Sequence, residues 1–81
     1  MPVVLRIGPY RFYFFSHEPN EPPHIHVDQD KLSAKFWLNP VALARNTGFS
    51  PKDLHSLQGM VREHQTEFVE AWNGYFGAER G

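Results

Sequence analysis

Residues 24–38, HIHVDQDKLSAKFWL, decide the fold, because two segments of alternating side chains flank a short polar turn. In the segment 33–38 every second residue is apolar, a pattern typical of a half-buried strand. The same period of two in 24–28 points Ile25 and Val27 one way and His24 and His26 the other. We therefore predict two neighbouring strands with one apolar face and one polar face.

Two further strands are predicted upstream. Aliphatic residues at 3–7 end at Gly8-Pro9, which is a turn signal, and an aromatic strand at 10–16 (YRFYFF and the residue after it) follows. A turn this short favours a hairpin. The segment HEPNEPP contains three prolines in seven residues, and we expect it to be a loop because each proline removes a backbone donor.

The second half of the chain is predicted to be helical. Asn39 and Pro40 can begin a short helix over 40–46, and Ser50-Pro51 begins a second helix over 51–76 with a hydroxyl cap. The sequence thus predicts one α+β domain over residues 1–81. Its four-stranded, mainly antiparallel meander is followed by a short helix and a long C-terminal helix packed on one face.

The long helix would extend roughly 39 Å at ~1.5 Å per residue, which is more than the width of so small a domain. Either the helix is distorted at Gly59, or its C-terminal end projects beyond the rest of the domain. A projecting end exposes an aromatic surface of the kind that binds a partner or a second copy of the chain. The predicted interface residues are Phe68, Trp72, Tyr75 and Phe76.

Composition limits the classes of function. The chain has no cysteine, which excludes disulfides and thiolate metal sites, and its formal net charge of -1 excludes a global basic field for nucleic acid. MPVVLRIGPY has neither the basic leader nor the cleavage site of a secretory signal, and no segment is long enough to span a membrane. We expect a cytoplasmic protein without a membrane partner and without a cofactor.

The segments EPPHIHV, AKFWL, NTGFSPKDL and EAWNGYF together resemble a family of small, mostly bacterial proteins known only as a domain of unknown function. The resemblance covers nearly the whole chain. It implies a second small protein encoded nearby, in an arrangement that suggests toxin and antitoxin pairs. It implies no catalytic residues.

The polar face of the sheet is the predicted site. His24 and His26 lie about 7 Å apart along one strand, enough to flank a phosphate as general base and general acid in metal-independent RNA cleavage. Strand 10–16 adds Arg11 and Tyr13 if its more polar side, which includes His17, faces the same way. Cations and aromatic rings on an open sheet are typical of proteins that bind single-stranded RNA. The predicted nucleic-acid-binding residues are Arg11, Tyr13, Lys35 and Trp37.

Two other interpretations of the histidines remain open. Histidines two apart on a strand can share a metal ion, with further ligands from His17, Glu18, Glu21 or Asp28, although two histidines alone are a weak signal. Alternatively the pair is structural and the chain is a non-enzymatic interaction module that docks a partner or its own copy. Taken singly, each histidine is most simply a tolerated polar residue on the exposed face of a strand.

Overall fold

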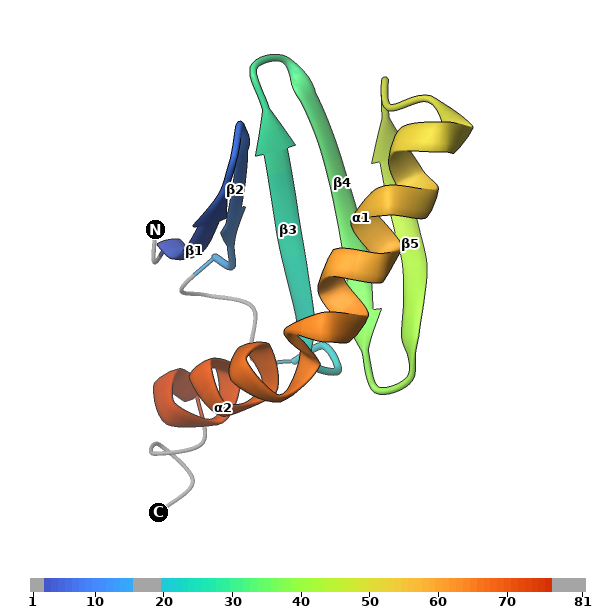
Figure 1. Ribbon diagram of the computed structural model, residues 1–81. Coiled ribbons are helices and arrows are strands. Elements are labelled where there is room, and N and C mark those ends of the chain that lie inside the picture. Colours follow the sequence, from blue (N-terminus) through green and yellow to red (C-terminus); the bar gives the residue numbers. More distant parts are fainter. Residues whose placement is uncertain (1–2, 16–19, 77–81) are drawn as a thin grey trace.

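The computed structural model describes residues 3–15 and 20–76, which form an antiparallel sheet of five strands followed by two helices (Figure 1). The strand order in space equals the order in sequence, so the sheet is a meander. The predicted α+β class is confirmed, with one more strand than expected and with the long helix divided in two. The elements are β1 (Val3–Ile7), β2 (Tyr10–Tyr13), β3 (His24–Gln29), β4 (Leu32–Leu38), β5 (Val41–Thr47), α1 (Pro51–Glu63) and α2 (Gln65–Phe76).

Tight turns set the register of the meander. The first hairpin turns at Gly8-Pro9, the β3–β4 hairpin at Asp30-Lys31 and the β4–β5 hairpin at Asn39-Pro40. Gly8 and Asp30 adopt positive φ angles of 56° and 53°, which glycine and aspartate tolerate better than most residues. Because these three loops have only two residues each, they fix the pairing of each hairpin next to its turn, and the register shifts further along, between Val3 and Leu5 and between Lys35 and Phe36.

The predicted helix over 40–46 is wrong, because these residues belong to β5. Asn39 and Pro40 match a helix start, yet here they form the turn that brings Val41 opposite Leu38. The outer edge of β4 carries backbone groups that need hydrogen-bond partners, and a strand supplies them where a helix cannot. Pairing with β4 thus outweighs the local sequence signal for a helix at Asn39 and Pro40.

A short connection leads from β5 to α1. The Asn46 side chain bridges it, since its Nδ2 donates to the Phe49 carbonyl at 3.0 Å and its Oδ1 accepts from the Phe49 N–H at 3.1 Å. Ser50 then caps α1 as predicted, accepting from the Asp53 N–H at 3.1 Å. The start of the second predicted helix at Pro51 is confirmed.

The helical segment breaks at His64, and neither of the two predictions for its length is correct. Gly59 lies within α1, and the end of α2 does not project, because Phe68, Trp72 and Phe76 are buried. A seven-residue strand extends only about 23 Å, which is shorter than the roughly 39 Å of one continuous helix. In a straight helix the stripe of Phe68, Trp72 and Phe76, which we call the aromatic stripe, would therefore lie beyond the end of the sheet. The break turns this stripe back onto the sheet.

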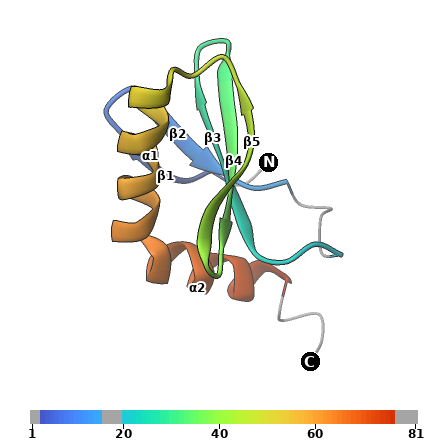
Figure 2. The same ribbon diagram turned by 90° about the vertical axis from the view of Figure 1, so that its right-hand side faces the viewer.

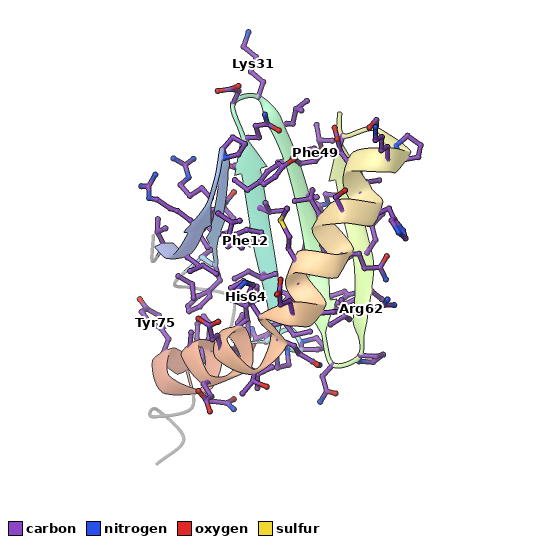
Figure 3. The ribbon with its side chains drawn as sticks, in the orientation of Figure 1. Phe12, Lys31, Phe49, Arg62, His64 and Tyr75 are labelled. Atoms are coloured by element: carbon purple, nitrogen blue, oxygen red, sulfur yellow. The ribbon has the colours of Figure 1, made fainter. Side chains whose placement is uncertain are left out.

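The two helices cover different parts of the sheet. Figure 2 shows α1 along one face and α2 passing below the end of the strands, and α2 contacts β3 and β4. Phe12 and Phe49 lie on the side that α1 covers (Figure 3). In the described ranges neither helix is long and apolar enough to cross a membrane. The core consists of Phe12, Phe14, Ile25, Val27, Ala34, Phe36, Leu38, Phe49, Leu57, Val61, Phe68, Trp72 and Phe76.

Candidate functional site

The face of the sheet opposite α1, which we call the open face, carries a row of aligned side chains. Tyr13 on β2 is opposite His26 on β3, His26 is opposite Lys35 on β4, and Lys35 is opposite Arg45 on β5. Residues directly opposite each other in adjacent strands have Cβ atoms about 5 Å apart and therefore interact. Four strands thus bring two aromatic rings and two cations into one line.

A bulge places Arg45 in this row. The register shifts between Lys35, which pairs with Arg45, and Phe36, which pairs with Leu43, so Ala44 is the extra residue of β5. Such a bulge reverses the alternation of side chains beyond it. Arg45 consequently faces the same side as Lys35, a position that the sequence did not predict because residues 40–46 were expected to be helical.

The row surrounds a pocket of about 210 Å³, which we call the central pocket. Its lining combines aromatic, hydroxyl and cationic groups. The lining residues are Tyr13, Phe15, His26, Ser33, Ala34, Lys35 and Arg45. Three predicted site residues, Tyr13, His26 and Lys35, therefore meet at one place.

The aromatic wall of the central pocket is built around His26. Its ring stacks on Tyr13 with centroids 5.3 Å apart and contacts the edge of Phe15 at 4.8 Å. Tyr13 is buried, whereas Phe15 and His26 are partly exposed. These ring contacts fix the orientation of the His26 imidazole at the pocket.

Lys35 is held by two partners. It is 9% exposed, its Nζ donates to the Glu21 carboxylate, and the same ammonium lies 4.7 Å from the ring centroid of Trp37. Burial of an ammonium is costly unless it is paired, and both contacts compensate for that cost. Trp37 thus touches the predicted cation, but it does not line the central pocket.

The predicted exposure of His24 is wrong, since the residue is 0% exposed. Its ring lies 4.7 Å from Trp72 on α2 and 5.1 Å from the ring of His26, measured between centroids. His24 Nδ1 lies 2.9 Å from the Pro22 carbonyl, which can only accept, so this nitrogen carries the proton. The sequence predicted the side of β3 correctly but not that α2 covers this end of it.

Arg11 is separated from the central pocket by Tyr13. The Tyr13 hydroxyl donates to Asp28 at 2.9 Å, and Arg11 Nη2 lies 3.4 Å from the same carboxylate. The Arg11 guanidinium is 5.9 Å from the Tyr13 ring centroid. It lines a second hollow, of about 280 Å³, together with Arg6, Pro9, Asp28 and Asp30.

Three of the four predicted interface residues are buried in the core. Phe68, Trp72 and Phe76 are 0%, 2% and 3% exposed and pack in the core of the chain itself. Tyr75 alone of the four is exposed, at 42%. The break at His64 has no strong sequence signal, so the sequence predicts a projecting aromatic end of the helix, whereas Phe68, Trp72 and Phe76 are buried.

No group of three His, Asp or Glu side chains within residues 3–15 and 20–76 is arranged to hold a metal ion. His17 and Glu18, which the metal interpretation would use, lie outside the described residues.

Comparison with known proteins places the chain in a family. No curated protein and no solved structure has significant similarity to it. The family described as "Domain of unknown function (DUF4160)" matches residues 10–73, from the start of β2 into α2. This range contains the predicted site residues on β2, β3 and β4, and it covers most of the chain. The chain belongs to the DUF4160 family.

Proposed function

We propose that the chain binds single-stranded RNA on the open face, with one nucleotide in the central pocket. The observation that carries the proposal is the lining of that pocket, which joins the rings of Phe15 and His26 to the cations Lys35 and Arg45. Unpaired bases stack on aromatic rings at about 1–3 kcal/mol each, and lysine and arginine bind the backbone phosphates. Lys35 is buried and already paired with Glu21, so Arg45 is the exposed cation of the pocket that supports a phosphate contact.

The pocket also contains a group suited to ribose. Ser33 on β4 contributes a hydroxyl to the lining. A hydroxyl can donate to and accept from the ribose 2′-OH, which is the group that distinguishes RNA from DNA. We therefore expect oligouridylate to bind more tightly than oligodeoxyuridylate of the same length.

The proposal is for binding and not for cleavage by a histidine pair. General acid and base catalysis requires that both groups reach the reacting atoms. His24 is fully buried and its Nδ1 proton is directed at the Pro22 carbonyl, which leaves His26 as the imidazole at the pocket. A toxin and antitoxin role with a small partner protein stays a prediction from the family resemblance, and RNA binding suits either member of such a pair.

Arg45→Gln tests the proposal. Arg45 is exposed, so its replacement should leave the fold intact while removing one charge-assisted contact to phosphate. We expect the dissociation constant for a labelled eight-nucleotide oligouridylate, measured by fluorescence anisotropy, to rise about tenfold, or ~1.4 kcal/mol.

The matched control is Arg62→Gln. Arg62 is also exposed but lies on α1, which covers the other face (Figure 3). The two variants change the net charge equally, so a general charge effect would weaken both. Absence of wild-type binding, or equal affinities of Arg45→Gln and wild type, would contradict the proposal.

A further inference from the structure

The second hollow of the open face, which we call the arginine hollow, brings together two guanidinium groups. Arg6 on β1 is directly opposite Arg11 on β2. Like charges in this position repel and destabilise a hairpin. Both side chains line the hollow of about 280 Å³, and a pair of guanidiniums around a concave surface is suited to an anion with several oxygen atoms.

The hollow also contains two carboxylates, Asp28 and Asp30, and among the described residues only Asp28 forms an ion pair with either arginine. Asp28 lies 3.4 Å from Arg11 Nη2, which is longer than the ~2.7–2.9 Å of a strong charge-assisted hydrogen bond. The same carboxylate also accepts from Tyr13. Among residues 3–15 and 20–76, no ion pair involves Arg6, and the buried Nε of Arg11 has no hydrogen-bond partner. Arg6 is exposed and the Arg11 side chain is 42% exposed, so outward N–H groups of both guanidiniums, although not the buried Nε of Arg11, can reach a ligand.

The arginine hollow lies next to the central pocket. The Tyr13 ring lines the central pocket, its hydroxyl binds Asp28 of the arginine hollow, and the Arg11 guanidinium is 5.9 Å from its ring centroid. A single side chain thus separates the two concave regions. Tyr13 and Arg11 are two residues apart on β2, a strand distance of ~7 Å.

We propose that Arg6 and Arg11 form a phosphate subsite that binds the RNA backbone beyond the nucleotide in the central pocket. This inference rests on the proposed function and extends it. The ligand is then a strand with at least two phosphates, which crosses Tyr13 from the β5 side of the sheet toward β1. A mononucleotide occupies the central pocket alone.

Salt dependence of binding tests the subsite. For single-stranded ligands the slope of log K against log salt is about -0.7 for each phosphate that the protein neutralises. Arg6→Gln should therefore reduce the magnitude of the slope for the eight-nucleotide oligouridylate by ~0.7, provided that one phosphate contact is lost. Between ~50 and ~200 mM KCl the affinity of this variant would then fall about 2.6-fold less than that of wild type.

Two further variants test whether the effect comes from the arginine hollow and not from net charge. Asp30→Asn removes a carboxylate from the arginine hollow and should tighten binding of the oligonucleotide. Arg62→Gln on α1 should keep the wild-type slope. Competition by uridine monophosphate, which reports on the central pocket, should be the same for wild type and Arg6→Gln.

The outcomes separate this inference from the proposed function. If the wild type binds the oligonucleotide and Arg6→Gln has an unchanged slope, the arginine subsite is wrong and RNA binding stands. An equal loss of slope in Arg62→Gln would also overturn the subsite, because the effect would then be one of net charge. If the wild type does not bind at all, both proposals fail.

Discussion

His24 and His26 belong to one strand and one alternation pattern, yet their surroundings differ. His26 is partly exposed at the central pocket, whereas His24 is enclosed by Trp37, Trp72 and the Pro22 carbonyl. A buried imidazole that makes a hydrogen bond and ring contacts contributes to stability. The difference arises from the position of α2, because it crosses the sheet at the end where β3 begins.

Replacement of His24 should therefore affect folding. His24→Ala removes a fully buried ring and its hydrogen bond, and we expect the free energy of unfolding to fall by about 2–4 kcal/mol. Urea denaturation followed by tryptophan fluorescence measures this change. His55→Ala, at an exposed position of α1, is the control and should stay within ~0.5 kcal/mol of wild type. An unchanged denaturation midpoint for His24→Ala would contradict a structural role.

Part of the candidate site could be predicted from the sequence. The period of two in β3 and β4 is local, and it was sufficient to place His26 and Lys35 on the same face. Arg45 could not be found in this way, since its position depends on a bulge and on pairing with β4. Burial of His24 depends on Trp72, which is 48 residues away in sequence and has no local signal.

For the helices too, only some boundaries could be predicted from the sequence. The cap at Ser50 and Pro51 is a local signal, and the start of α1 was predicted from it. The end of α1 at Glu63 has neither a glycine nor a proline beside it, so the sequence favours one continuous helix. The break depends on aromatic side chains of α2 that pack against Phe14 beyond the end of β2.

Gly59 provides a test of the helical elements. It lies in α1, and a Cβ built on it meets no atom within 4 Å. Gly59→Ala should therefore raise the free energy of unfolding by about 0.5–1 kcal/mol through the higher helix propensity of alanine. Thermal denaturation followed by circular dichroism measures the effect. A lower melting temperature would contradict the regular helix at this position.

Gly48→Ala is the matched comparison and should have the opposite sign. Gly48 has a φ of 96°, and a Cβ there would lie 2.6 Å from Leu32 Cδ2. Both the backbone conformation and the close approach disfavour alanine. The same substitution thus stabilises one glycine position and destabilises the other.

At the scale of the whole molecule, α2 joins the core to the end of the sheet. Trp72 contacts Phe14 and Phe76 in the core and His24 on β3, with ring centroids 5.6, 4.3 and 4.7 Å away. The Trp72 side chain therefore connects α2 both to β3 and to the segment that follows β2. In a domain of this size the core is small, so each large buried ring is a large share of total stability.

Trp72→Ala should consequently unfold much of the molecule. We expect a loss of about 3–5 kcal/mol, against the total of ~4–12 kcal/mol usual for a domain of this length. Tyr75→Ala, three residues further along the same helix, changes a side chain that is 42% exposed and should cost far less. Denaturation curves and molecular masses from light scattering, measured for both variants, show whether the aromatic stripe belongs to the core or to an interface. If Trp72→Ala instead keeps wild-type stability and only changes the molecular mass, Trp72 belongs to an interface and not to the core.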